Sequence, residues 1–424
     1  MTTGRCGDRL VVVGQGYVGL PVAMRAVDAG FSVVGLEVDQ IRLWSLSDGV
    51  SYIDDVPSDR LRAAIDTGRY LPSGDYRDAD GFGAAIITVP TPLKDREPDL
   101  SFIVSATTQL APHLRRGATV VLESTTCPGT TDELVVPALE QGSGLVAGRD
   151  FAVGYSPERL DPGNKQWGLV NTPKVISGID ERSLAAVRAL YSRLVDTVVP
   201  VSAPRVAELS KLLENTFRHI NIALINEIAI LAHELGVDVW EAVDAAATKP
   251  FGFLRFTPGP GVGGHCLPVD PTYLAWLVRR DLNRSFRFVA MANDINDHMP
   301  DYVVRRLTAT LDRRHKPVAD STVMLLGLAY KANTGDTREA PGLRVFELLT
   351  QLGAVVHVAD THVEQHRSPP EMKFVDLSVE SLRAADVVVL ITDHDDVDYE
   401  LVTAEAPWVL DTRHRLSGAR VEHL

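Results

Sequence analysis

Short apolar runs alternate with stretches of helical spacing through the first half of the chain. The runs lie at 10–13, 31–36, 84–89, 118–122, 151–154 and 174–177. Buried parallel strands are typically continuous apolar runs, and helical crossovers connect them. The pattern therefore predicts a doubly wound parallel sheet with helices on both faces.

The first predicted strand leads directly into GQGYVG, where Gly14, Gly16 and Gly19 fill the G-x-G-x-x-G pattern. In a dinucleotide-binding fold these glycines allow a tight turn, approach of the backbone to a pyrophosphate, and close packing of helix on strand. Glu37, at the end of the next strand, is expected to bind ribose hydroxyls and to repel a 2′-phosphate, so the predicted cofactor is NAD rather than NADP. A glycine-rich turn in an unrelated α/β domain is the alternative.

A long amphipathic segment follows this region. From Pro204 to Leu235 apolar residues recur every three or four positions, and Gly236 comes next. The spacing predicts one long helix that ends at the glycine. Lys211 and Asn215 are four residues apart and so share a face of that helix, although a lysine in such a position is more often a solvated surface residue.

The rest of the chain repeats the α/β pattern on a smaller scale, with strands predicted at 322–328, 354–359 and 387–392. No glycine fingerprint opens this part, so we expect no second dinucleotide there. The predicted fold class is α/β, with two Rossmann-like doubly wound parallel sheets joined by a long central helix. The predicted domains are an N-terminal NAD-binding domain over 1–200, a central helical domain over 201–314 and a C-terminal Rossmann-like domain over 315–424.

Composition excludes several classes of function. The formal net charge of −14 disfavours nucleic acid as a partner, because phosphate backbones attract basic surfaces. No apolar run approaches the roughly 18 to 20 residues of a membrane span and no signal peptide is recognisable, so we expect a cytoplasmic protein without membrane contact. Cys6, Cys127 and Cys266 are expected to be reduced thiols. We expect no metal site, since His233 lacks a second histidine four residues on, where Val237 stands.

Polar clusters follow three of the predicted strands, at the end where such sheets bind ligands. They are VPTP at 89–92, ESTTCPGT at 123–130 and YSPERLDPG at 155–163. A further stretch, GPGVGGHCLPVDP at 259–271, places Cys266 near Asp270. Each cluster is also compatible with ordinary turn chemistry, and the cysteine with a small buried apolar residue. The occurrence of all these clusters in one chain favours a functional site over ordinary turns.

Together with GQGYVG and two further motifs, these four segments make the chain resemble the UDP-glucose/GDP-mannose dehydrogenase family over essentially its whole length. The motifs, in family order, are GQGYVG, VPTP, ESTTCPG, SPER, AELSKLLENTFR, GVGGHCLPVDP and GLAYKANTGDTREAP. The resemblance implies NAD-dependent oxidation of the C6 alcohol of a nucleotide-linked hexose to a carboxylate in two steps, without release of the aldehyde. It also implies a role in polysaccharide biosynthesis and a homodimer formed through the central helix.

The resemblance also assigns chemical roles. Cys266 would attack the aldehyde to give a thiohemiacetal, whose oxidation gives a thioester that water hydrolyses. Lys211 and Asn215 would stabilise the developing oxyanion. Protons and the hydrolytic water would be handled by Asp270, Thr125 and Glu158, and which of these is the working base stays open.

Two sets of binding residues are implied in the same way. NAD would contact Gly14, Gly16, Tyr17, Val18, Gly19, Glu37, Pro90, Thr91 and Thr125. The nucleotide sugar would contact Glu158, Arg159, Leu160, Lys211, Asn215, Phe256, Gly263, Lys331 and Arg338. Of these, Lys331 and Arg338 would hold the nucleotide end, which places the expected active site between domains.

The substrate is less sharply indicated. The segments at 89–102 and 249–271 are most similar to the branch that oxidises UDP-N-acetylhexosamines. Arg255 is unusual for that branch, and Ala340 stands where the family has a serine before the proline of the TREAP motif. UDP-glucose and a dTDP-hexose therefore stay open as substrates.

Two other classes fit parts of the sequence. A β-hydroxyacid dehydrogenase shares the fold and the long helix but transfers one hydride and needs no cysteine, so the GGHC motif argues against it. A catalytically idle NAD-binding scaffold would have no reason to retain Cys266, Lys211 and Asp270 together.

Overall fold

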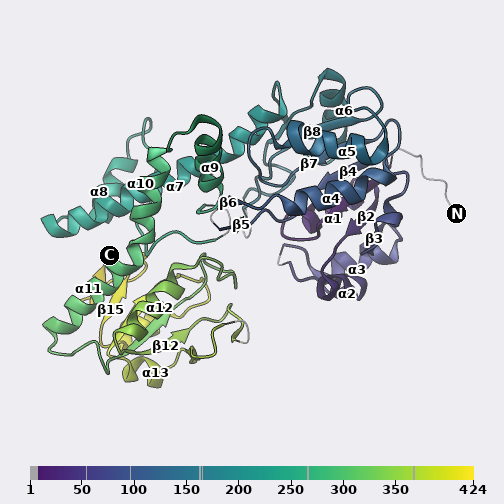
Figure 1. Cartoon of the computed structure of the whole chain (residues 1–424). Helices are drawn as coiled ribbons and strands as arrows, with labels where there is room; N and C mark the ends of the chain where they lie inside the picture. Colours follow the sequence, from purple (N-terminus) through teal and green to yellow (C-terminus); the bar gives the residue numbers. More distant parts are fainter. Residues whose placement is uncertain are drawn as a thin grey trace. The chain divides into compact units, whose positions relative to one another are not determined.

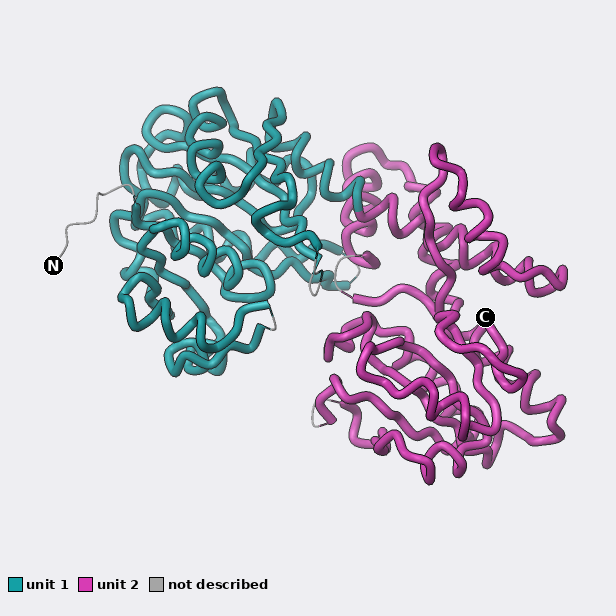
Figure 2. Tube along the Cα trace, turned by 180° about the vertical axis from the view of Figure 1, so that it is seen from behind, with its two compact units in different colours: residues 1–214 teal, residues 215–424 magenta. Residues whose placement is uncertain are grey.

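The computed structural model describes residues 8–53, 55–95, 97–161, 164, 166–264, 267–365 and 368–424. The chain forms two compact units, residues 1–214 and 215–424, which Figure 2 distinguishes by colour. Each unit contains a six-stranded parallel sheet. Among the described residues no helix is both long and apolar enough to span a membrane.

The sheet of the first unit has the strand order β3-β2-β1-β4-β7-β8. Figure 1 labels β2, β3, β4, β7 and β8 of this sheet. Its strands are Arg9–Val13 (β1), Ser32–Leu36 (β2), Tyr70–Ser73 (β3), Ala84–Ile87 (β4), Thr119–Leu122 (β7) and Ala152–Tyr155 (β8). Counted along the chain this is the order 3-2-1-4-5-6 of dinucleotide-binding sheets, which bind ligands at the carboxyl ends of the strands. The doubly wound sheet predicted from the sequence is confirmed, although β3 was not among the predicted strands.

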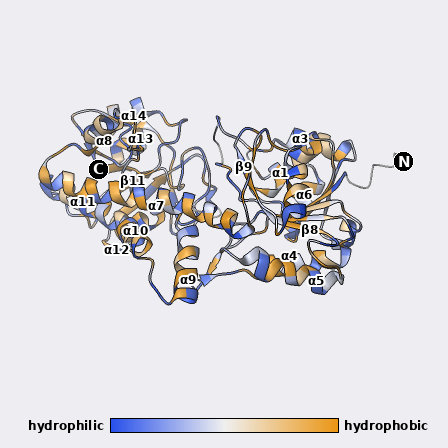
Figure 3. Ribbon diagram, turned by 90° about the horizontal axis from the view of Figure 1, so that it is seen from above, coloured by the Kyte–Doolittle hydropathy of each residue, from blue (hydrophilic) through white to orange (hydrophobic). Residues whose placement is uncertain are grey.

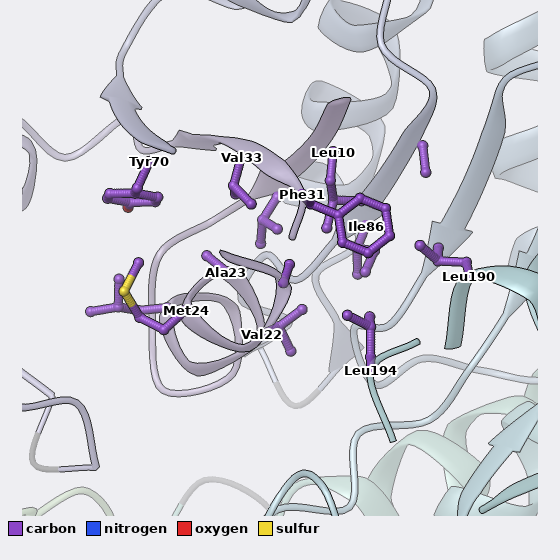
Figure 4. Close-up of a cluster of buried hydrophobic side chains, with 14 of the residues drawn as sticks. Leu10, Val22, Ala23, Met24, Phe31, Val33, Tyr70, Ile86, Leu190 and Leu194 are labelled. Atoms are coloured by element: carbon purple, nitrogen blue, oxygen red, sulfur yellow. The ribbon is translucent and has the colours of Figure 1, made fainter. Parts of the chain in front are cut away.

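Apolar cores lie on both faces of this sheet. Because side chains alternate along a strand, Leu10 and Val12 of β1 belong to one core and Val11 and Val13 to the other. Figure 4 shows part of the first core, including Leu10. The helices that contribute to it are α1 (Gly19–Asp28), α2 (Gln40–Ser47), α3 (Ser58–Asp66) and α6 (Glu181–Tyr191). Those that contribute to the second are α4 (Ser101–Leu110), α5 (Val136–Ser143) and the start of α7 (Pro204–Leu235).

The apolar run predicted as a strand at 174–177 does not join the main sheet. It forms β9 (Lys174–Ile176), which pairs in parallel with β10 (Val198–Pro200) in a separate two-stranded sheet. A short apolar run predicts a strand but does not identify its partner, so the sequence could not assign this one. A small antiparallel pair, β5 (Leu93–Lys94) and β6 (Glu97–Pro98), completes the unit.

The predicted long helix is confirmed as α7 (Pro204–Leu235), of 32 residues. Gly236 follows it with a φ of 68°, a left-handed conformation that favours glycine and ends helices. Near its end, α7 packs with α8 (Val239–Ala247) through an apolar cluster that includes Ala229 and Trp240.

The second unit contains a sheet of the same topology, in the order β13-β12-β11-β14-β15-β16. Its strands are Thr322–Leu326 (β11), Val355–Ala359 (β12), Lys373–Phe374 (β13), Val387–Leu390 (β14), Val409–Asp411 (β15) and Val421–His423 (β16). One core contains residues of α11 (Met299–Arg313) and α12 (Pro341–Gln351), and the other residues of α13 (Val379–Ala384) and α14 (Tyr399–Glu405). Two further helices, α9 (Asp270–Leu282) and α10 (Arg287–Asp297), precede α11.

Candidate active site

The glycine turn after β1 has the geometry that a dinucleotide requires. Gly14 has a φ of 89°, and a Cβ added to it would lie 2.9 Å from the carbonyl oxygen of Thr88. A Cβ on Gly19 would lie 1.8 Å from the oxygen of Gly14, so helix and turn pack too closely for any side chain. Gly16, in contrast, has no atom within 4 Å of the added Cβ. Open space beside the backbone at the start of α1 fits a pyrophosphate there.

Glu37 lies at the end of β2, where the sequence predicts a ribose ligand. Its buried carboxylate accepts hydrogen bonds from the backbone N–H groups of Gln15 (3.1 Å), Val38 (2.9 Å) and Asp39 (3.0 Å). An ionised carboxylate can accept about four hydrogen bonds, so roughly one acceptor position remains. The role of Glu37 in binding a ribose stays a prediction.

The loops after β4 and β7 are joined to each other. Ser124 donates its hydroxyl to the carbonyl oxygen of Val89, at 2.8 Å. Within these loops Pro90 is exposed, Thr91 is buried and Thr125 is half-buried. The hydrogen bond brings together two segments predicted to contact NAD.

Glu208 of α7 anchors the loop that carries Thr125. Its buried carboxylate accepts hydrogen bonds from the backbone N–H groups of Gly129 (2.6 Å) and Thr131 (2.9 Å), and from the Thr131 hydroxyl (2.7 Å). Burial raises the pKa of Glu208, while these hydrogen bonds stabilise its charged form. Sequence reasoning missed this residue, since an acid in an amphipathic helix is normally assigned to the solvent face.

Lys211 and Glu158 form a buried ion pair in the first unit. The Nζ atom of Lys211 lies 3.1 Å from Oε2 of Glu158, and the two residues are 5% and 8% exposed. The interpretation of Lys211 as a solvated surface lysine is therefore wrong. Next to this pair, Arg159 forms an ion pair with Glu214 of α7 and donates to the carbonyl oxygen of Pro173 at 2.6 Å.

Asn215 lies one helical turn after Lys211 on α7. In the second unit, its amide donates to Oδ2 of Asp270 at 2.5 Å, and both residues are buried. Asp270 is the first residue of α9. The structure thus brings two predicted catalytic residues into direct contact.

Cys266 lies outside the described residues, but the glycine loop that leads to it is described up to Gly264. The N–H of Gly264 donates to the carbonyl oxygen of Arg338 at 2.9 Å. A Cβ on Gly263 would lie 2.6 Å from the oxygen of Glu339, and one on Gly264 would lie 2.7 Å from the ring of Tyr330. Because the loop approaches the segment that follows β11 so closely, only glycine fits at these two positions.

The start of the same loop is held by a buried polar network that the sequence did not reveal. Asn226 of α7 accepts a hydrogen bond from the N–H of Gly259 (2.9 Å) and donates to Asn296 of α10 (2.9 Å). The ring of His219 contacts Asn293 of α10 at 2.7 Å. Burial lowers the pKa of His219, which favours the neutral imidazole.

The residues predicted to hold the nucleotide end follow β11. The guanidinium of Arg338 forms an ion pair with Asp336 (2.5 Å), and Lys331 is half-buried. Phe256 packs edge-on against Phe217 of α7, with ring centroids 5.9 Å apart. The roles of these three predicted residues in substrate binding, and those of Tyr17, Val18 and Leu160, stay predictions.

One cluster in the described residues has the composition of a metal site: His362, His394 and Asp396. Both ring nitrogens of His394 already have partners, because Nδ1 accepts the N–H of Asn333 (2.9 Å) and Nε2 contacts Asp360 (3.1 Å). Hydrogen bonding within the protein therefore explains this cluster.

Three family models match the chain in succession. They are the NAD binding, central and UDP binding domains of the UDP-glucose/GDP-mannose dehydrogenase family, over residues 8–195, 205–298 and 324–418. The UDP-N-acetyl-D-mannosamine dehydrogenase of Pyrococcus horikoshii is 36% identical over 92% of this chain and 90% of its own. The solved structure of the UDP-D-ManNAc dehydrogenase from that organism has a TM-score of 0.87, with 98% of each chain covered and 33% identity. A UDP-glucose dehydrogenase structure from Pyrobaculum islandicum, 27% identical, also has a TM-score of 0.87, covering 100% of this chain and 98% of that one.

Proposed function

Because the chain belongs to the UDP-glucose/GDP-mannose dehydrogenase family, we propose that it oxidises the C6 alcohol of a UDP-N-acetylhexosamine to the uronate. The protein is an NAD-dependent nucleotide-sugar dehydrogenase, as the sequence motifs predict. The N-acetylhexosamine is favoured because relatives named for such substrates match nearly the whole chain. We also propose the three-domain division at 1–200, 201–314 and 315–424.

The observation that carries the proposal is the pair of buried polar contacts made by α7. Lys211 faces the carboxylate of Glu158, and one turn later Asn215 donates to Asp270. A cation and an amide fixed on one rigid helix can stabilise an oxyanion with little reorganisation. Carboxylates in contact with them are positioned to exchange protons or to orient water.

In the proposed reaction each site residue has a separate role. NAD, when bound, accepts a hydride in each of the two oxidations, and the overall reaction is R–CH2OH + H2O + 2 NAD⁺ → R–COO⁻ + 2 NADH + 3 H⁺. We propose that the Cys266 thiolate adds to the intermediate aldehyde and retains the substrate carbon as a thiohemiacetal and then a thioester. Lys211 and Asn215 would stabilise the oxygen that becomes negative, and the carboxylates of Glu158 and Asp270 or the hydroxyl of Thr125 would activate the hydrolytic water.

Counting NADH against a panel of sugars tests this function. We expect two NADH per uronate with UDP-N-acetylmannosamine or UDP-N-acetylglucosamine, and lower kcat/KM with UDP-glucose and dTDP-glucose. One NADH per molecule of substrate would instead indicate a single-hydride dehydrogenase. Higher kcat/KM with UDP-glucose or the dTDP-sugar would refute the proposed substrate while leaving the reaction type intact.

We also propose a homodimer formed through α7. Apolar side chains, each at least 40% exposed, form a stripe along this helix: Val206, Leu209, Leu213, Phe217, Leu224, Ile228, Leu231 and Leu235. Figure 3 shows hydrophobic residues recurring along it. Their spacing of three, four or seven residues along about 44 Å of helix is the pattern of a helix that packs on another helix. A second copy offers the same stripe, so the two surfaces are complementary by symmetry.

The variant Ile228→Glu/Leu231→Glu is expected to be a monomer, because carboxylates in the stripe would have to be buried at the interface without partners. Sedimentation velocity gives the mass directly. Ala246→Glu, at an exposed position of α8, adds the same kind of charge outside the stripe and should leave the dimer intact. A monomeric wild type, or a dimeric double variant, would exclude α7 as the interface.

We infer that the enzyme acts in the cytoplasm, where thiols stay reduced. Cys127 is a buried cysteine, and the proposed mechanism requires a thiol at Cys266.

A further inference from the structure

We propose that Lys174 is a positioning residue of the active site, whose ammonium holds two strand-end segments at a fixed distance from each other. One of these segments carries Thr125 and the other carries Glu158. The inference rests on the proposed function, because it is there that these two residues receive catalytic roles.

Lys174 is buried at the start of β9, where it is 3% exposed. Its Nζ forms an ion pair with Glu123, which is 1% exposed, and also donates to the carbonyl oxygen of Pro157 at 3.0 Å. Glu123 directly follows β7 and precedes Thr125 by two residues, whereas Pro157 directly precedes Glu158. A single ammonium therefore connects the ends of β7 and β8.

Tyr191 of α6 completes this cluster. Its hydroxyl donates to the other oxygen of the Glu123 carboxylate at 2.6 Å, and its ring centroid lies 5.4 Å from the lysine Nζ. Burial, followed by the neighbouring carboxylate, raises the pKa of Tyr191 well above its usual value, so the hydroxyl keeps the proton that it donates. Each carboxylate oxygen of Glu123 therefore has its own hydrogen-bonding partner, which fixes the orientation of the carboxylate.

A buried ion pair is weak evidence for stability, because desolvation offsets most of the attraction and apolar residues of similar volume often serve as well. What apolar residues cannot do is bind the Pro157 carbonyl and the Glu123 carboxylate at the same time. Pro157 is adjacent to Glu158, whose carboxylate lies 3.1 Å from the Nζ of Lys211. A shift of this backbone would change the contact between Glu158 and Lys211.

The test separates positioning from stability with two variants. Lys174→Met leaves Glu123 buried without a cation, so we expect a lower Tm and a kcat reduced at least about tenfold. The triple variant Glu123→Met/Lys174→Met/Tyr191→Phe removes the three polar side chains of the cluster but keeps the Pro157 carbonyl. We expect it to regain most of the lost Tm while kcat stays low, because the Pro157 carbonyl still lacks its donor.

Lys316→Met is the matched control, since that lysine is also paired with an acid, Asp386, but at an exposed position of the second unit. It should keep the wild-type kcat. If the triple variant recovered kcat as well as Tm, the cluster of Glu123, Lys174 and Tyr191 would contribute only to stability, and the inference would be overturned. The wild-type enzyme tests the proposed function itself. A wild type that produces no NADH with the sugar would overturn the proposed function and, with it, the inference about Lys174.

Discussion

Replacing Lys211 with alanine is expected to lower kcat more than about a hundredfold, the scale of losing one oxyanion donor, with little change in KM for either substrate. The side chain is buried and its Nζ lies 3.1 Å from a carboxylate oxygen of Glu158. In the proposed mechanism this ammonium stabilises negative charge that develops on the substrate oxygen, so its loss should affect the transition state more than binding. Initial rates of NADH formation at several sugar concentrations measure both constants.

Two further variants separate catalysis from folding. Lys211→Ala leaves the buried Glu158 carboxylate without its cation, so Lys211→Ala/Glu158→Gln removes the unpaired charge and should restore part of any lost stability. It should not restore kcat, because the oxyanion would still lack its donor. Lys249→Ala makes the same substitution at an exposed lysine beyond α8 and should leave kcat unchanged. A Lys211→Ala enzyme with nearly normal kcat would exclude the proposed role.

Long, regular elements were predictable because their pattern is local. The helix 204–235 was predicted with both of its ends, since its apolar spacing continues without interruption until Gly236. The strands of continuous apolar residues, such as Val387–Leu390, were predicted for the same reason. The strands that escaped prediction are short, as in Lys373–Phe374 and Val421–His423, and their pairing in the sheet rather than their own sequence defines them.

The supporting residues of the site were not predictable for a different reason. Glu123 and Lys174 are separated by 51 positions, and neither belongs to a pattern that distinguishes a buried charge from a solvated one. Asp270, in contrast, was identified through its motif, and Lys211 through its place in AELSKLLENTFR. Motif recognition predicts residues that act on ligands, whereas residues that hold those side chains in place become visible only when the fold gives their partners.

The helix α7 links the fold to the proposed chemistry. On successive turns of one face it carries Glu208, which fixes the loop of Thr125, then Lys211, which faces Glu158, and then Asn215, which donates to Asp270. Further along, Asn226 holds the start of the glycine loop that leads to Cys266. Within each unit, the hydrogen bonds of the helix fix the spacing between the turns that carry these groups.

Replacing Cys266 with serine is expected to nearly abolish steady-state turnover while leaving the affinities for NAD and the nucleotide sugar within a few-fold of wild type. In the proposed mechanism sulfur attack is required only after the first hydride has been transferred, so the second half of the reaction should suffer most. A hydroxyl is far less acidic than a thiol with a pKa of about 8.5, which makes serine a poorer nucleophile and a poorer leaving group. The serine enzyme should therefore accumulate a slowly hydrolysed ester, detectable by mass spectrometry of the intact protein.

Cys266→Ala removes the nucleophile altogether and gives the sharpest outcome. We expect at most one NADH per sugar and no sugar attached to the protein, because neither thiohemiacetal nor thioester can form at that position. Cys127→Ala is the matched control, since it removes a buried cysteine to which no role is assigned and should still produce two NADH per uronate. If either Cys266 variant formed uronate with two NADH at an appreciable rate, the thiol would be structural. The four-electron oxidation would then have to proceed through the free or hydrated aldehyde, with Lys211 and Asn215 as its remaining oxyanion donors.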